Sequence, residues 1–201
     1  MRRARTRLVA GLLLAAALHG EVVTELDVAY DTRSPKQKLD LYYDDGAGQG
    51  LRPAIVLVHG GGWSSGDKGG KLWRTLPVEF AQRGYVAASV NYRLTDEAPT
   101  PAQIEDVKAA VRWLRANAER LRLDPDRIGA FGHSAGAHLV ALLGLTRPKD
   151  GLEGDGPNQE QSSAVQAVLA WAAPTDFARW LESGQYPREA VEAFLAGPDE
   201  T

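Results

Sequence analysis

The amino-acid sequence predicts an α/β fold, with a mostly parallel central sheet and helices packed on its faces. The run 54–58 is apolar at every position, which is typical of a strand buried on both faces. Segments of strand character also alternate with segments of helix character, which favours βαβ units with right-handed crossovers. With 201 residues, the chain fits one domain better than two.

The first half of the domain is expected to hold strands at 22–30, 38–43, 54–58 and 85–90 and a helix over 72–83. In the second strand, the alternation of Leu39, Leu41 and Tyr43 with Asp40 and Tyr42 is typical of a β-strand. Gly84 stops the helix, and Pro77 either kinks it or marks its start. The strand 85–90 is again apolar and expected to be buried.

The second half is expected to hold helices over 100–123, 134–145 and 189–195 and strands at 127–131 and 165–172. The first of these helices has Thr100 as N-cap and Pro101 at its first position, and Asp124 ends it. Its apolar residues recur in steps of three and four and predict one buried stripe: Ile104, Val107, Val111, Leu114, Ala118 and Leu121. The segment 150–163 is rich in Gly, Asp, Gln and Ser and is interpreted as a surface loop.

The first twenty residues differ from the rest and predict a signal peptide. Four arginines, at positions 2, 3, 5 and 7, precede an apolar run of 11 residues at 8–18, which is too short for a stable membrane anchor. Cleavage is expected after Ala17 or after Gly20; the alternative is an N-terminal core helix. We therefore expect a domain at 21–201, exported to the periplasm or the medium. It would hold 19 basic and 26 acidic residues, and its net charge of −7 does not suggest a nucleic-acid partner.

The segment 129–138, GAFGHSAGAH, contains the spacing G-x-S-x-G around Ser134. The predicted strand ends just before this serine and a predicted helix begins at it, which is the context of a nucleophile on a sharp strand-to-helix turn. Glycine is needed at 132 and 136 because side chains there would collide with the strand and the helix. The turn would place Ser134 at the positive end of a helix, with the Ala135 N–H directed at developing negative charge. The alternative is an ordinary serine in a glycine-rich turn.

A second glycine-rich segment, His59 to Trp63 (HGGGW), follows the buried strand 54–58. Consecutive glycines let a backbone approach a ligand closely and turn its N–H groups inward. A phosphate-binding loop would need Gly-Lys-Ser/Thr at a spacing that 66–68 does not supply, and a dinucleotide fingerprint fails because Ser65 stands where its third glycine should be. A flexible surface loop becomes a poor explanation once this segment is paired with Ser134, which also follows a strand.

These segments stand in one order with several others, and together they resemble the α/β-hydrolase superfamily. The resemblance is to its carboxylesterases and lipases similar to hormone-sensitive lipase and to feruloyl and acetyl-xylan esterases. It rests on LDLY at 39–42, HGGGW at 59–63, GDK at 66–68, NYRL at 91–94, DVKAAVRWL at 106–114, DPDRI at 124–128 and GHSAG at 132–136. By this resemblance Ser134 is the nucleophile, and the N–H groups of Gly61, Gly62 and Ala135 form the oxyanion hole. His59, Gly132 and Gly136 support them, and no metal or organic cofactor is implied.

The chain departs from the family pattern in its acid and its base. The resemblance implies the order Ser, Asp/Glu, His, yet the four histidines are His19, His59, His133 and His138, and none follows the last. We expect His133 to point away from Ser134, His138 to pack in the interior and His59 to buttress the glycine loop. Asp176 is the only acid candidate. The segment 196–201 resembles the stretch before the family's last two strands, so six of eight strands are expected in a C-terminally truncated chain.

We therefore predict a serine ester hydrolase that acts through an acyl-enzyme on Ser134, with a small-molecule or carbohydrate-linked ester as substrate. The chain by itself is expected to be almost inactive, because it lacks the acid and the histidine. Three other hypotheses stay open: a serine peptidase similar to prolyl oligopeptidase, a binding module that keeps the pocket without catalysis, and a chain that a second polypeptide completes.

Overall fold

The computed structural model describes residues 20–46, 50–184 and 188–196, and its centre is a six-stranded sheet. The strands are β1 (Val22–Ala29), β2 (Lys38–Asp44), β3 (Arg52–Val58), β4 (Val86–Val90), β5 (Leu123–His133) and β6 (Ala167–Trp171). They lie in the order β1-β2-β4-β3-β5-β6. The predicted signal peptide falls on residues 1–19, outside the described residues, apart from Gly20.

The predicted α/β class is confirmed, with a sheet that is parallel in its second half. β3 runs parallel to β4 and to β5, and β5 runs parallel to β6, whereas β1 pairs with β2, and β2 with β4, in antiparallel fashion. The five residues of β4 are all buried, as expected for a central strand covered on both faces. The carboxyl ends of β3 and β5 lie side by side, since Val58 pairs with Gly132. The two glycine-rich segments therefore leave the sheet at the same edge.

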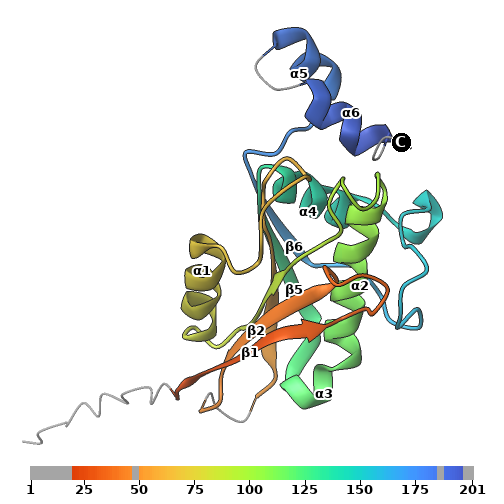
Figure 1. Cartoon of the computed structure of the whole chain (residues 1–201). Helices are drawn as coiled ribbons and strands as arrows, with labels where there is room; N and C mark the ends of the chain where they lie inside the picture. Colours follow the sequence, from red (N-terminus) through yellow and green to blue (C-terminus); the bar gives the residue numbers. More distant parts are fainter. Residues whose placement is uncertain (1–19, 47–49, 185–187, 197–201) are drawn as a thin grey trace, which may run out of the picture.

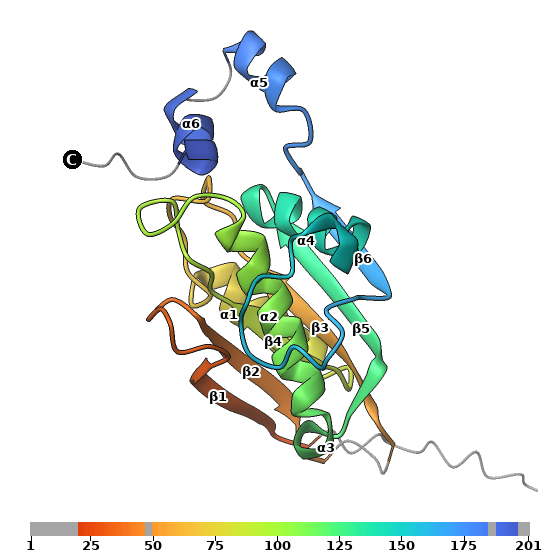
Figure 2. The same ribbon diagram turned by 90° about the vertical axis from the view of Figure 1, so that its right-hand side faces the viewer.

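Helices cover both faces of this sheet (Figures 1 and 2). Helix α1 (Lys71–Ala81) packs on β4, β2 and β3 from one side. Helices α2 (Ala102–Ala116), α3 (Ala118–Leu121) and α4 (Ala135–Leu145) lie on the other side, where α2 packs on α4 and both contact β5. The predicted apolar stripe of α2 is buried: Ile104, Val107, Val111 and Leu114 are at most 1% exposed.

Several predicted boundaries are wrong for local reasons. Pro101, not Thr100, is the N-cap of α2, and no side chain caps this helix. The predicted long helix breaks at Asn117, whose backbone leaves the helical region, and the short α3 ends at Arg122 in the left-handed region. Strand β5 then begins at Leu123 and takes in Asp124, which we expected to end a helix. Pro77 lies inside α1 and does not start it.

Beyond α4, the chain forms a short 3₁₀ helix (Pro148–Asp150), strand β6 and two further helices, α5 (Phe177–Ser183) and α6 (Arg188–Ala196). Helix α5 was not predicted. Both helices lie beyond the carboxyl end of the sheet (Figure 1). The loop before β6 runs alongside α2 (Figure 2), where Glu153 forms ion pairs with the buried side chains of Lys108 and Arg112. Strand β6 is the edge of the described sheet, and all its residues are exposed. No helix in the described part of the chain is long and apolar enough to span a membrane.

Candidate active site

Ser134 stands at the sharp turn between β5 and α4, as the N-cap of the helix. Its φ of 55° and ψ of −121° lie where a residue with a side chain is strained. The Ser134 N–H donates to the carbonyl of Trp171 on β6 at 2.9 Å, which fixes the turn against the neighbouring strand. Strained residues held by their surroundings cluster at functional sites, so this conformation marks Ser134 as a candidate for chemistry.

Both flanking glycines are required by space. A Cβ on Gly132 would lie 2.3 Å from the Gly136 carbonyl oxygen, and one on Gly136 would lie 2.1 Å from the Val58 carbonyl oxygen. Real Cβ atoms do not approach backbone atoms so closely. The G-x-S-x-G spacing is thus imposed by the passage of α4 over β5 and against the end of β3.

The loop that begins at His59 lies directly against this turn. A Cβ on Gly60 would come within 3.1 Å of the Ser134 Cβ. Gly61, Gly62 and Trp63 then follow with φ of 128°, 61° and 60°. Ser65 closes the loop, since its N–H and its hydroxyl both donate to the Gly61 carbonyl, at 3.0 and 2.9 Å.

Three backbone N–H groups in the glycine loop and the serine turn have no hydrogen-bond acceptor among the described residues. Within the described part of the chain, no residue accepts a hydrogen bond from the N–H of Gly61, Gly62 or Ala135. The Ala135 N–H belongs to the first turn of α4, where amides lack a partner within the helix. Free amides next to a strained serine can bind an oxygen that acquires negative charge.

The side chain of His59 is hydrogen-bonded to the backbone of this loop. Its side chain is 1% exposed, and its Nδ1 lies 2.8 Å from the Gly60 carbonyl oxygen, to which Nδ1–H donates. Burial lowers the pKa of His59, so the ring is neutral near pH 7. Tyr92 stacks on the imidazole at 4.5 Å and donates its hydroxyl to the His59 carbonyl at 3.0 Å. Tyr92 lies within the NYRL segment of the sequence, where nothing assigned it a role at the site, although its place just after β4 puts it at the same edge of the sheet.

No described residue offers a base to Ser134, whose hydroxyl makes no hydrogen bond within the described ranges. The His133 ring packs against Trp171, with centroids 4.9 Å apart. The His138 ring packs against Trp63 and Phe177, and burial lowers its pKa to about 4. These positions agree with the expectation that neither histidine acts as the base.

Asp176 is the N-cap of α5, and its carboxylate accepts a hydrogen bond from the Arg179 N–H at 2.9 Å. Its side chain is exposed, and the contact that the structure gives it is structural. A depression of about 460 Å³ lies beside it, lined by Ala173, Pro174, Thr175, Asp176, Arg179, Trp180 and Ser183. Among the described residues, no histidine is hydrogen-bonded to the Asp176 carboxylate.

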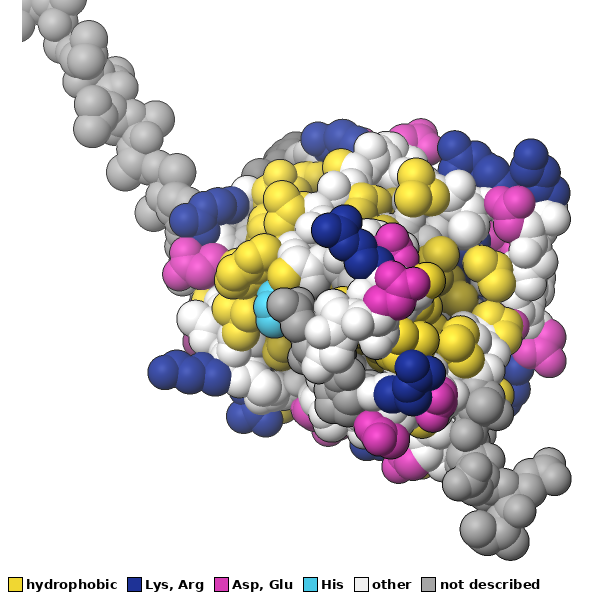
Figure 3. Space-filling view, turned by 90° about the horizontal axis from the view of Figure 1, so that it is seen from above, with side chains coloured by type: hydrophobic (Ala, Val, Ile, Leu, Met, Phe, Trp, Pro, Cys, Tyr) yellow, Lys and Arg dark blue, Asp and Glu magenta, His cyan; other side chains and the backbone are white. Residues whose placement is uncertain are grey.

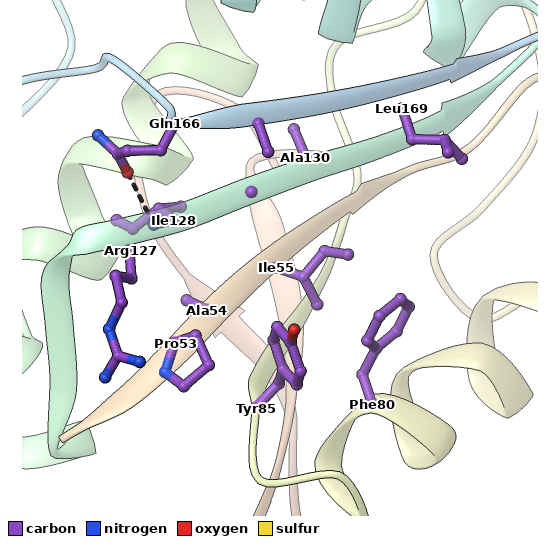
Figure 4. Close-up of a pocket in the computed structure, with 12 residues that line it drawn as sticks. Pro53, Ala54, Ile55, Phe80, Tyr85, Arg127, Ile128, Ala130, Gln166 and Leu169 are labelled. Carbon is purple, nitrogen blue, oxygen red and sulfur yellow. Dashed lines mark hydrogen bonds between the residues drawn. The ribbon is translucent and has the colours of Figure 1, made fainter. Parts of the chain in front are cut away.

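The end of the molecule at which α5 and α6 lie is partly apolar. Seen from the end of the molecule at which α5 and α6 lie, hydrophobic side chains gather between charged ones (Figure 3). A different apolar trough, of about 320 Å³, lies on the α1 side of the sheet, where Phe80 and Tyr85 face Ile55 and Leu169 (Figure 4). None of its lining residues belongs to the serine turn or the glycine loop, so it is not the candidate active site.

Comparison with known proteins gives a consistent family. The family model BD-FAE matches residues 39–200. The chain is 30% identical over 178 residues to the probable carboxylic ester hydrolase LipM of Mycobacterium tuberculosis (strain ATCC 25618 / H37Rv), which covers 88% of this chain and 40% of LipM. The chain thus spans about two fifths of the length of this curated relative.

Two solved structures are similar over most of the chain. A truncated carbohydrate esterase from gut microbiota has a TM-score of 0.76 and 28% identity, covering 87% of this chain and 65% of that one. Esterase 2 of the planctomycete Thermogutta terrifontis with bound butyrate has a TM-score of 0.65 and 30% identity, covering 87% and 61%. Both likenesses support the α/β-hydrolase fold.

Proposed function

The chain belongs to the BD-FAE family of α/β-hydrolase-fold esterases, and from this premise we propose that it carries the nucleophile and the oxyanion hole of a serine carboxylic-ester hydrolase. The observation that carries the proposal is the strained Ser134 lying against a loop in which the Gly61 and Gly62 amides find no acceptor among the described residues. The esterase relatives support this chemistry and do not favour the peptidase alternative.

In the proposed reaction, the Ser134 Oγ attacks the ester carbonyl carbon while its proton passes to a base. The carbonyl oxygen becomes an oxyanion, which accepts hydrogen bonds from the N–H groups of Gly61, Gly62 and Ala135. As this tetrahedral intermediate collapses, the leaving oxygen takes the proton back from the base, so that the alcohol is released and an acyl-Ser134 ester remains. Water then attacks the acyl carbon, and the acid leaves as Ser134 is restored.

His59, Gly132 and Gly136 have supporting roles in this proposal. Neutral His59 ties the loop at Gly60 and receives the Tyr92 hydroxyl on its carbonyl. The two glycines let α4 begin close to β5 and β3. Asp176, the weak acid candidate, keeps that role only if a histidine reaches it, and the described residues supply none.

The proposal predicts weak turnover for the 201-residue chain, because no imidazole of the described residues is hydrogen-bonded to the Ser134 hydroxyl. Catalytic serines without their base retain about 10³–10⁴-fold acceleration over water, owing to the oxyanion hole and binding. Imidazole added to the buffer can accept the proton in place of a side chain. We therefore expect its addition to accelerate the reaction of Ser134.

The decisive experiment uses a fluorophosphonate, whose phosphorus is attacked by the serine Oγ as fluoride leaves. We expect intact mass spectrometry to show one adduct, mapped to Ser134, that forms faster when imidazole is added. Ser134→Ala should abolish the adduct, and Ser183→Ala, which changes an exposed serine on α5, should leave it unchanged. An adduct that survives in Ser134→Ala would refute the proposed nucleophile. A folded chain that is never labelled would support the binding-module alternative.

We further propose that the substrate is a small-molecule or carbohydrate-linked ester. The carbohydrate esterase among the similar structures supports the second kind. With imidazole present, an aryl ester and an acetylated sugar should be hydrolysed, whereas an aminoacyl anilide should not. Cleavage of the anilide at a similar rate would favour the peptidase alternative.

We also propose that residues 1–20 are a signal peptide ahead of a domain at 21–201. The support is the basic patch followed by the apolar run 8–18. Expression in a Gram-negative host should yield periplasmic protein with a new N-terminus at 18 or 21. Recovery of the uncleaved chain from the cytoplasm alone would overturn export.

A further inference from the structure

The left-handed backbone conformation of the glycine loop continues past its last glycine, Gly62, to Trp63. Gly61 and Gly62 adopt positive φ without a steric cost, because they have no Cβ. Trp63 follows at a φ of 60°, which is a true outlier for a bulky residue. Such strain persists only where the surroundings over-determine the conformation.

Aromatic side chains from three helices hold Trp63. Its indole is 1% exposed and stacks on Phe194 of α6, with centroids 4.4 Å apart and ring planes 23° from parallel. Phe177 and Trp180 of α5 meet it edge-on at 5.6 and 6.4 Å, and His138 of α4 does so at 5.5 Å. We call these five residues the Trp63 cluster.

The main chain around the cluster is tied to one segment, 95–100. The Thr95 N–H donates to the Trp63 carbonyl at 3.0 Å, and the Thr100 N–H donates to the Phe194 carbonyl at 2.9 Å. Phe194 itself is 2% exposed. Trp63 is therefore fixed through its ring and its backbone at once, with Gly61 and Gly62 immediately before it.

We propose that Trp63 is a positioning residue for the oxyanion hole: the Trp63 cluster holds the left-handed backbone of 61–63 and thereby directs the Gly61 and Gly62 amides toward the oxyanion. This inference rests on the proposed function and adds that α5 and α6, far along the sequence, determine the geometry of the loop. Loss of Phe194 should therefore disturb the oxyanion hole as loss of Trp63 does.

Boronic acids test this without turnover. The Ser134 Oγ adds to boron and the serine proton is released to buffer. The resulting tetrahedral adduct carries one negative charge, formally on boron, and places one of its hydroxyl oxygens in the oxyanion hole. Dissociation constants for phenylboronic and ethylboronic acid are measured by calorimetry on the full chain, alongside a melting curve for each variant. The ethyl compound has no ring to contact the cluster, so it reports on the hole itself.

We expect Trp63→Ala and Phe194→Ala to weaken both boronic acids by tenfold or more, and Trp63→Phe by less than threefold, because the ring and not the indole N–H does the holding. Two matched controls should stay within threefold of the wild type. Trp73→Phe changes a buried tryptophan on α1, and Leu195→Ala changes an exposed neighbour of Phe194. If Trp63→Ala does not fold, Phe194→Ala decides.

Any smaller separation between the cluster variants and the controls overturns the inference. A loss confined to phenylboronic acid also overturns it, since Trp63 would then contact the ligand and not position the loop. Ser134→Ala distinguishes a failure of the proposed nucleophile from a failure of the positioning role of Trp63. If it leaves boronic acid binding intact, the proposed function fails, whereas intact binding in Trp63→Ala alone refutes only the positioning role.

Discussion

The tight passage of α4 over β5 makes one substitution especially informative. Gly132→Ala would place a Cβ at 2.3 Å from the Gly136 carbonyl oxygen, 2.4 Å from its carbonyl carbon and 2.8 Å from the Ala137 nitrogen. All three are backbone atoms of the first turn of α4, so no side chain can rotate away. Gly129→Ala is the matched control on the same strand, because its Cβ would meet nothing closer than the Ala167 carbonyl oxygen at 3.7 Å.

The magnitude follows from these distances. Relieving the Gly132→Ala contact requires α4 to move by roughly 1 Å, and overpacking of this kind costs about 3 kcal/mol of unfolding free energy. For a domain of this size each kcal/mol lowers the Tm by about 2–4 °C, so we expect a Tm about 6–12 °C below that of the wild type. Gly129→Ala should be neutral or slightly stabilising, since it reduces the entropy of the unfolded chain.

Differential scanning calorimetry of the wild type and both variants measures this. The Gly132→Ala variant should also lose fluorophosphonate labelling at Ser134, because the displaced turn no longer holds the serine against the glycine loop. A Tm for Gly132→Ala within 2 °C of that for Gly129→Ala would refute the reasoning that the elbow glycine is required by space.

Two further predictions concern buried charge. Burial lowers the pKa of His138 from 6.5 to about 4, so the unfolded chain binds more protons between these values and stability is lost as the pH falls from about 6.5 to about 4. The Tm of His138→Asn should therefore rise relative to that of the wild type as the pH falls through this window. A Tm difference that does not change with pH would contradict the lowered pKa of His138. Glu153→Gln should cost about 3–5 kcal/mol, because Lys108 and Arg112 are each 1% exposed and share this carboxylate. Glu160→Gln, on the exposed part of the same loop, is the control for urea unfolding, and equal effects would show that the buried pairs do not matter.

Local pattern was sufficient for most of the fold. The alternation at Leu39 and Leu41 and the apolar run at 54–58 predicted strands because a side chain's face depends only on its position along the strand. The local pattern did not predict the backbone conformations of Asn117 and Arg122, at which the chain leaves the helical region. These two residues split the predicted long helix. The local pattern also missed α5, whose start is fixed by the side chain of Asp176.

The candidate site divides in the same way. Ser134 and its glycines could be predicted because the turn from strand to helix imposes its own spacing over five residues. Tyr92 could not, since nothing near it in the sequence shows that its ring stacks on His59. The interpretation of 150–163 as a surface loop held for the backbone but missed the burial of Lys108 and Arg112 against Glu153.

By itself, the sequence determined the order of strands and helices, the serine at the turn and the glycine loop that follows β3, because each depends on residues adjacent in the chain. Only the tertiary structure decided which side chains and backbone segments contact one another. It set Gly60 against Ser134, packed Trp63 on Phe194 and left Ser134 without an imidazole among the described residues. The physical reason is that these contacts join segments far apart in sequence, and such segments meet only when the sheet forms and brings its carboxyl edge together.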